Sequence, residues 1–135
     1  MSETNPTMTD LFGEVIHSYT RAQAIEDGVL IDLSAIAPDV CRQHYKYPIA
    51  CTAPVWSIID EAVNNPRFDC DHKGIIHDML FMSIHYKTFV LSEQEVIFEC
   101  MMPLYEHQKV YQFKMNCGPN DDLTPCLTIM LPNED

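Results

Sequence analysis

In the last third of the chain, hydrophobic positions recur with a period of two, and this alternation predicts β-strands. Three runs show it, at residues 96–102, 111–117 and 127–131. Turn-forming stretches separate these runs, "LYEHQ" at 104–108 and "GPNDD" at 118–122. Short strands joined by such turns usually pair with their sequence neighbours. We therefore expect an antiparallel meander of three strands.

Two segments in the middle of the chain repeat hydrophobic residues at the spacing of one helix face. The first follows Pro54, a residue favoured in the first turn of a helix, and stops before Pro66. The second continues to about Lys87. The face residues are Val55, Ile58, Ile59, Ala62 and Val63 in the first segment, and Ile75, Ile76, Met79, Leu80 and Ser83 in the second. We expect two amphipathic helices.

The stretch "VIHSYTRAQAIEDGVLIDL", residues 15–33, combines strand and helix signals. The apolar pair at 15–16 is typical of a short strand. Thr20 and Gln23 then match a capping box, in which each side chain bonds the backbone of the other residue. Gly28 stands where a left-handed residue ends a helix, and "VLIDL" follows as a second strand. The pattern predicts a β-α-β segment.

Two further elements are expected before the first amphipathic helix. Ser34 is placed to cap a short helix that contains Pro38 in its first turn. The stretch "YPIACT", residues 47–52, is typical of a buried strand.

These elements predict an α+β fold in a single domain over residues 11–135. In this fold the C-terminal three-stranded meander and the N-terminal β-α-β segment pack against the two amphipathic helices. Residues 1–10 are polar and acidic, and we expect them to form a flexible N-terminal arm.

The balance of charge excludes one class of function. Eight basic and twenty acidic residues give a formal net charge of −12. Direct binding of nucleic acid requires a basic patch, whereas the basic residues here are scattered from Arg21 to Lys114. Nucleic acid is therefore not expected as a partner. The acidic surface favours solubility, or a protein partner that is itself basic.

The cysteines and the apolar runs bear on the cellular compartment. Six cysteines are present, most of them inside apolar runs, and the N-terminus lacks a basic-then-apolar signal pattern. We therefore expect reduced, buried thiols and no disulfides. No run approaches the roughly 18 apolar residues of a membrane helix. These features predict a cytoplasmic protein that does not associate with membranes.

Candidate metal ligands are few. Cys70, His72 and His77 lie close in sequence, but no second ligand pair stands elsewhere, and a polar loop before a helix explains them better. The chain also lacks G-x-S-x-G, Walker, G-x-G-x-x-G and H-E-x-x-H motifs. We expect neither a metal nor a cofactor.

One enzymatic alternative starts from "VIHSYT". A strand that ends in a histidine and a hydroxyl, followed by a short helix and "DGVL", resembles the opening of ADP-ribosyltransferase domains. That resemblance implies that His17 and Thr20 position the ribose of NAD. The catalytic glutamate has no convincing position, because Glu99 lies within a predicted strand and Glu134 near the chain end.

Acidic side chains provide a different functional hypothesis. Glu95 and Glu99 share one face of a predicted strand, with successive same-face residues about 6.6 to 6.8 Å apart. Such rows can present phosphate-like charge to a DNA-binding protein, and Asp121 and Asp122 in the predicted turn are further candidates. The alternative is a solvated acidic surface. The members of the full set are Asp60, Glu61, Asp69, Asp71, Glu93, Glu95, Glu99, Asp121 and Asp122.

Several stretches of the chain resemble an uncharacterised family carried by bacteria, phages and plasmids. They are "DLFGEVI" at 10–16, "YTRAQAIEDGVLID" at 19–32, "YPIACTAPVW" at 47–56 and the tail at 117–135. The resemblance spans nearly the whole chain. It implies a small intracellular domain of unknown function in mobile elements, a setting compatible with counter-defence such as anti-CRISPR or anti-restriction activity.

Three functional hypotheses follow. The leading one is a non-enzymatic acidic protein of a mobile element that inhibits a basic nucleic-acid-handling partner by mimicking DNA charge. The second is an NAD-dependent ADP-ribosyltransferase-like enzyme, and the third is a general interaction module with an apolar interface. Tyr19, Arg21 and Asp27 are candidate binding residues, because they belong to the family motif and folding alone does not explain them. Arg21 stands out, since a cation in the first helical turn opposes the helix dipole. Pairing of Arg21 with Asp27 or Asp32 is the structural alternative.

Overall fold

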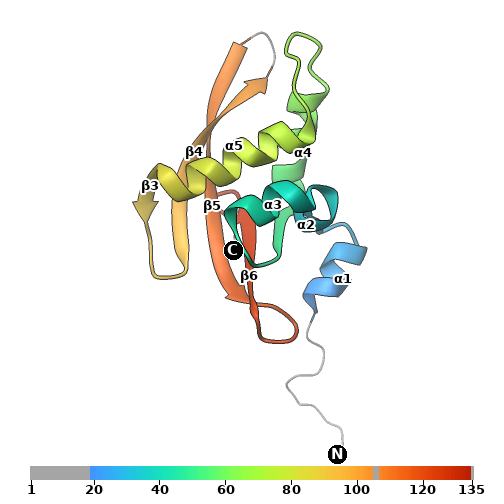
Figure 1. Cartoon of the computed structure of the whole chain (residues 1–135), viewed down its shortest axis with the longest axis vertical. Helices are drawn as coiled ribbons and strands as arrows, with labels where there is room; N and C mark the ends of the chain where they lie inside the picture. The colour runs from blue at the N-terminus through green and yellow to red at the C-terminus, as the bar shows by residue number, and fades with distance from the viewer. Residues whose placement is uncertain (1–18, 105–106, 135) are drawn as a thin grey trace, which may run out of the picture.

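A mixed β-sheet of six strands runs through the molecule, and helices cover one of its faces (Figure 1). The computed structural model describes residues 19–104 and 107–134. These residues form an α+β fold with five helices and six strands. The helices are α1 (Arg21–Glu26), α2 (Leu33–Ile36), α3 (Pro38–His44), α4 (Ala53–Val63) and α5 (His72–His85); the strands are β1 (Leu30–Asp32), β2 (Ile49–Thr52), β3 (Lys87–Val90), β4 (Glu95–Leu104), β5 (His107–Pro119) and β6 (Pro125–Met130).

The strands follow the order β1-β2-β6-β5-β4-β3 across the sheet. The β2–β6 pair is parallel, and each other neighbouring pair is antiparallel. β4, β5 and β6 are neighbours in the sheet, so the three strands expected from the period-two runs lie side by side. They belong to a larger sheet, in which β3 lies beyond β4 and β2 lies beyond β6. β1 and β3 lie at its opposite edges.

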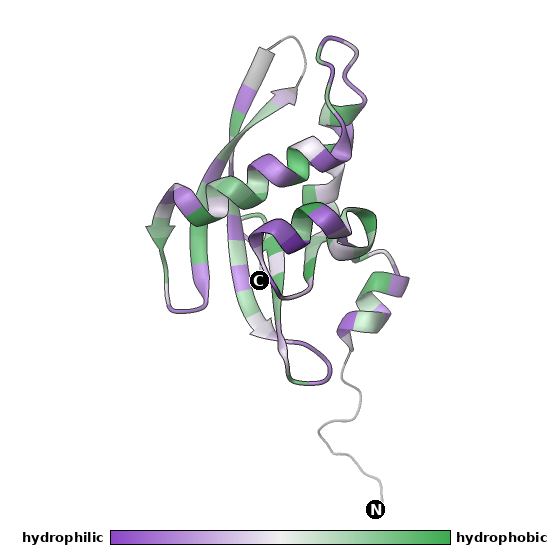
Figure 2. Ribbon diagram, viewed as in Figure 1, coloured by the Kyte–Doolittle hydropathy of each residue, from purple (hydrophilic) through white to green (hydrophobic). Residues whose placement is uncertain are grey.

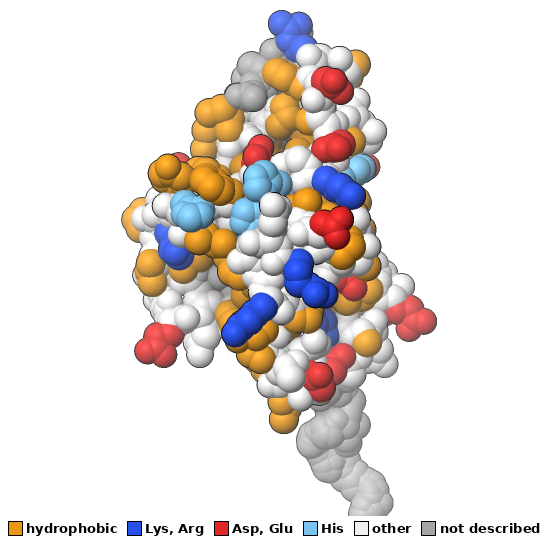
Figure 3. Space-filling view, viewed as in Figure 1, with side chains coloured by type: hydrophobic (Ala, Val, Ile, Leu, Met, Phe, Trp, Pro, Cys, Tyr) orange, Lys and Arg blue, Asp and Glu red, His pale blue; other side chains and the backbone are white. Residues whose placement is uncertain are grey.

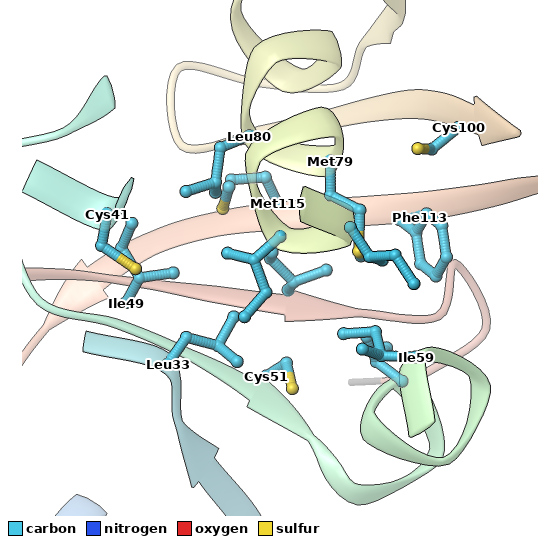
Figure 4. Packing of buried hydrophobic residues seen from close by; sticks show 14 of the residues in the cluster. Leu33, Cys41, Ile49, Cys51, Ile59, Met79, Leu80, Cys100, Phe113 and Met115 are labelled. Atoms are coloured by element: carbon cyan, nitrogen blue, oxygen red, sulfur yellow. The ribbon is translucent and has the colours of Figure 1, made fainter. Parts of the chain in front are cut away.

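The main hydrophobic core lies between the helices and one face of the sheet. In Figure 4, Met79 and Leu80 of α5 point toward the sheet, where Phe113 and Met115 of β5 meet them. Each of these four side chains is at most 4% exposed. The alternation of the strands directs the even-numbered residues of β4 and the odd-numbered residues of β5 and β6 into this core.

The opposite face of the sheet is also partly covered. Lys114 is 8% exposed, and its ammonium donates to the backbone oxygen of Glu134 at 2.7 Å. The Glu134 carboxylate accepts hydrogen bonds from the Thr52 hydroxyl and the Leu131 amide, each at 2.8 Å. The C-terminal residues are therefore bonded to this face. Its buried hydrophobic residues are Ala50, Ile97, Cys126 and Met130.

The capping signals of the N-terminal segment are confirmed. Thr20 and Gln23 form both bonds of the capping box at the start of α1, and Gly28 adopts a left-handed φ of 80° after the helix. The strand expected at 15–16 and the arm expected at 1–10 lie outside the described residues. Within the described residues, the predicted β-α-β segment consists of α1 followed by β1, which lies at an edge of the sheet.

The prediction that Ser34 caps the next helix is wrong. Asp32 is the N-cap of α2, and its carboxylate accepts from the Ala35 amide. The Ser34 hydroxyl instead accepts from the Ile49 amide at 2.8 Å, which joins α2 to β2. A carboxylate two residues earlier in the chain took the cap position because β1 ends there. Pro38 begins a separate helix, α3.

The second amphipathic helix ends earlier than expected, at His85 instead of near Lys87. Residues Lys87–Val90 turn into β3, which pairs with β4. Helical periodicity could not mark this change, because the hydrophobic residues Phe89 and Val90 follow the helix without a break. None of the described helices is long and apolar enough to cross a membrane.

Candidate functional site

Arg21, predicted as a binding residue, fastens α1 to the sheet. Its guanidinium donates to the Thr128 hydroxyl at 2.8 Å and to the Leu127 backbone oxygen at 2.7 Å. The Asp121 carboxylate accepts from the backbone amides of Arg21 and Ala22, at 2.9 and 3.1 Å. An anion at the start of a helix is favoured by the helix dipole. The two residues therefore join α1 to β6 and to the β5–β6 turn. Within the described chain the guanidinium of Arg21 bonds Thr128 and Leu127, and the alternative pairing of Arg21 with Asp27 or Asp32 is not found.

Tyr19 and Asp27, the other candidates in this segment, bond to each other. The Tyr19 hydroxyl donates to the Asp27 carboxylate at 2.6 Å, and this bond raises the pKa of Tyr19. Tyr19 remains 57% exposed. The Thr20 hydroxyl accepts from the Gln23 amide, so its lone pair already serves the helix cap. Tyr19, Thr20, Arg21 and Asp27 therefore each have a hydrogen-bond partner within the fold. His17 lies outside the described residues.

The acidic pair Glu95 and Glu99 lies on the face of β4 opposite the main core, with the buried Ile97 between them. Their carboxylates accept from the side-chain amides of Asn116 and Gln112, their direct partners on β5. Their hydrogen-bond partners are distinct from those of Asp121, which bonds the start of α1.

Asp122 lies in the turn between β5 and β6. Its carboxylate accepts from the hydroxyl and the amide of Thr124, and these bonds lower the pKa of Asp122. Four predicted acidic candidates, Glu95, Glu99, Asp121 and Asp122, therefore have partners within the fold. On the face shown in Figure 3, acidic side chains stand apart, with Lys and Arg side chains among them.

The three residues considered as metal ligands have separate partners. The Cys70 thiol donates to the Ala62 carbonyl, His72 stacks on Trp56 and bonds Asp60, and His77 bonds a different histidine. No group of three or more potential ligands able to hold a metal occurs within the described part of the chain.

All six cysteines are free. Burial raises the pKa of the Cys51 thiol and of the Cys100 thiol to about 12 in each case. Because the thiolate is the reactive form, these two side chains act as small hydrophobic residues at neutral pH.

Two histidines meet between α3 and α5. Nε2 of His44 lies 2.8 Å from Nδ1 of His77, so one ring donates and the other accepts. Burial, followed by the charges of His77 and His85, lowers the pKa of His44. Phe81 stands between His77 and His85, with ring centroids 6.4 and 4.5 Å away. The neutral form of His44 is therefore the one that this contact favours.

Next to the histidines, an exposed apolar surface extends along the edge of the sheet. We call it the β3 edge surface, and it consists of Phe81, Tyr86, Phe89, Val90 and Leu91, each 39–69% exposed. Five of the twelve large hydrophobic residues exposed within the described chain are therefore close in sequence at one edge. Figure 2 shows the hydrophobic colour of β3, and Figure 3 shows hydrophobic side chains beside the histidines.

Sequence reasoning missed the β3 edge surface. The signal for it is the stretch "YKTFVLSE", residues 86–93, which is rich in aromatic and β-branched residues and ends in a polar turn. The helical pattern predicts a helix that continues to about Lys87, which conceals the start of this strand.

The fold and its surfaces define a small α+β protein with an exposed apolar sheet edge. The chain belongs to the family of unknown function DUF6573, whose model matches residues 8–135. This confirms the resemblance to an uncharacterised family. No curated protein and no solved structure shows a significant match.

Proposed function

We propose that this protein is a non-enzymatic protein-binding module that takes up an extended segment of a partner at the β3 edge surface. The observation that supports this proposal is the exposure of β3, where all four residues are open to solvent. Large apolar patches rimmed by polar residues are typical of interaction sites. This function corresponds to the interaction module with an apolar interface among the sequence-based hypotheses.

The backbone of β3 provides the second support for an extended partner. The Leu91 amide donates to the Glu95 carbonyl, toward β4. Because inward and outward bonding residues alternate in an antiparallel ladder, the N–H and C=O of the preceding Val90 point away from β4. Unpaired groups of this kind bind a further strand, with side-chain contacts supplying specificity.

Two features of β3 limit uncontrolled strand pairing. Lys87 places a charge on the edge, and the register with β4 shifts between Lys87 and Phe89. Both are common protections of edge strands. They leave Phe89 and Val90 open, at 58% and 69% exposure, so the available edge is short and suits a brief extended segment.

The net charge favours a different protein over a second copy as the occupant. Each copy carries a formal charge of −12, so two copies repel at low ionic strength. A neutral or basic partner meets no such repulsion. We therefore assign the surface to an apolar extended segment of another protein.

A matched pair of substitutions tests the proposal. Val90→Pro removes the outward N–H, whereas Val90→Ala shortens the side chain and keeps the N–H. Because edge strands tolerate proline where the N–H faces solvent, both variants should fold. Loss of one hydrogen bond of about 1–1.5 kcal/mol weakens binding roughly tenfold, so Val90→Pro should bind the partner at least that much more weakly than Val90→Ala.

The partner itself can be obtained by positional cross-linking in a cell lysate. A photoreactive benzophenone side chain at position 89 should capture it, whereas the same group at Leu123, which is 81% exposed in the β5–β6 turn, should not. Equal capture from both positions, or capture of a second copy of this chain, would contradict the proposal.

The charge-based hypothesis is a second candidate, and the net charge of −12 favours it. In that case the protein inhibits a basic nucleic-acid-handling partner, and its affinity falls steeply between 50 and about 500 mM salt, since exposed charges are screened. The mobile-element and counter-defence setting belongs to this candidate and stays a prediction. An NAD-dependent activity through His17 also stays a prediction.

A further inference from the structure

We infer that a cleft between α5 and β4 binds the side chain of an arginine. The cleft has a volume of about 410 Å³ and lies beside the loop that joins α4 to α5. It does not include any residue of the β3 edge surface, so this inference goes beyond strand binding. The volume falls within the range typical of ligand pockets, roughly 300–1,000 Å³.

The apolar part of the cleft comes from both elements. Ile75, on the first half of α5, is 4% exposed, and Cys100 and Met102, on β4, are 3% and 0% exposed. Met101 and Pro103 of the same strand also border the cleft. An aliphatic chain of three methylene groups, such as that of arginine, packs well against such a surface while its charged end stays near water.

The charged part of the cleft consists of carboxylates, and His77, which bonds His44, also lines it. Asp69, Asp71 and Asp78 line it and are exposed, and neither Lys nor Arg is among its lining residues. The Asp71 carboxylate caps α5 by accepting from the Gly74 amide. Within the described chain the carboxylates of Asp69 and Asp78 accept no hydrogen bond. These two carboxylates are available to a ligand.

The thiols of the cleft respond to this negative charge. Burial is the largest cause of the raised pKa of Cys70, and Asp69 and Asp71 add to it. Asp78 likewise adds to the effect of burial on the pKa of Cys100. The cleft therefore combines an apolar lining with negative potential, a pairing that selects a cation on an aliphatic stem.

A guanidinium matches this arrangement better than an ammonium. It carries five N–H donors in a planar fork, so it can bond two carboxylates at once, and it is less strongly hydrated. A partner that presents an exposed arginine would thus be recognised at two places, by its extended backbone at β3 and by this side chain.

An NMR titration with two small probes tests the inference. Nα-acetyl-arginine methylamide should shift amide signals mainly within residues 68–78 and 100–103 in a saturable way. The citrulline analogue has the same shape without charge and should give no saturable shifts. Asp78→Asn should weaken the arginine probe by at least about fivefold, the effect of losing roughly 1 kcal/mol.

Glu93→Gln provides the matched control, because it removes one exposed carboxylate in the β3–β4 turn without touching the cleft. It should leave the affinity unchanged. Equal binding of the citrulline probe, shifts spread over exposed carboxylates in general, or the absence of localised shifts would each overturn the inference. Val90→Pro should not alter this titration, so failure here is distinct from failure of strand binding at β3.

Discussion

Arg21 shows how a single residue that opposes helix stability can be explained by a contact far away in the sequence. A cation in the first turn of α1 is unfavourable for the helix itself. A hydrogen bond from a charged group contributes about 1.5–3 kcal/mol. The two bonds of the Arg21 guanidinium to Leu127 and Thr128 of β6 therefore outweigh the unfavourable interaction with the helix dipole.

Replacement of Arg21 should therefore destabilise the protein. Arg21→Ala is expected to lower the free energy of unfolding by about 1.5–3 kcal/mol, measured by urea denaturation. Arg21→Lys should recover only part of this, because an ammonium cannot reproduce the planar fork. Arg42→Ala is the control: Arg42 is exposed in the last turn of α3, and its loss should change stability by less than about 0.5 kcal/mol. Equal effects of Arg21→Ala and Arg42→Ala would refute the anchoring role.

His44 makes the stability depend on pH in a defined direction. Its pKa in the folded protein lies below the ordinary value of 6.5, so the unfolded chain binds the proton more readily. The free energy of unfolding should therefore decrease as the pH falls below about 6.5 toward the folded-state pKa. His44→Gln removes this contribution, and its stability measured between pH 7.5 and 5 should decline less than that of the unmodified protein. Identical pH profiles would show that His44 does not contribute.

At the scale of elements, the sequence predicted the start and the end of α1 well. The Thr20–Gln23 box and Gly28 depend on neighbouring residues alone, and the structure confirms them. Ser34 was assigned wrongly because its hydroxyl bonds β2, a contact that local sequence does not reveal. Likewise, the strand signal of residues 86–91 directly follows the helical pattern, and pairing with β4 shows where the strand lies.

The cap of α5 offers a test at this scale. Asp71→Ala removes the acceptor of the Gly74 amide and should lower the free energy of unfolding by about 0.5–2 kcal/mol. Asp69→Ala, two residues earlier in the same loop, is the matched control and should cost less than about 0.5 kcal/mol. Thermal unfolding of both variants, followed by circular dichroism, measures the difference. A larger loss from Asp69→Ala than from Asp71→Ala would argue against this assignment of the cap.

For the candidate site, the sequence predicted carboxylates as binding residues but could not show which contacts they make within the fold. Asp27 and Asp121 bond partners eight or about one hundred residues away in the chain. Such contacts arise from the path of the chain, which periodicity does not encode. The cleft was missed for the same reason, because it joins α5, β4 and the loop before α5. The β3 edge surface was missed because its strand signal directly follows a helix.

The whole molecule combines a high negative charge with an apolar binding edge. Several of its acidic side chains cap helices or bond a neighbouring strand, so part of the negative charge has a structural role. The acidic cleft and the apolar edge give two separable contributions to partner binding, one that depends on salt and one that does not.

The affinity of the cross-linked partner for the intact protein, measured in 50 and in 500 mM NaCl with Val90→Ala and Val90→Pro alongside, tests the central claim most directly. Strand addition at β3 predicts that the affinity changes by less than about tenfold between the two salt concentrations, since exposed charges are screened at the higher one and apolar and backbone contacts persist. It also predicts that Val90→Pro binds at least about tenfold more weakly than Val90→Ala. A steep loss of affinity with salt, together with equal binding by the two variants, would contradict it.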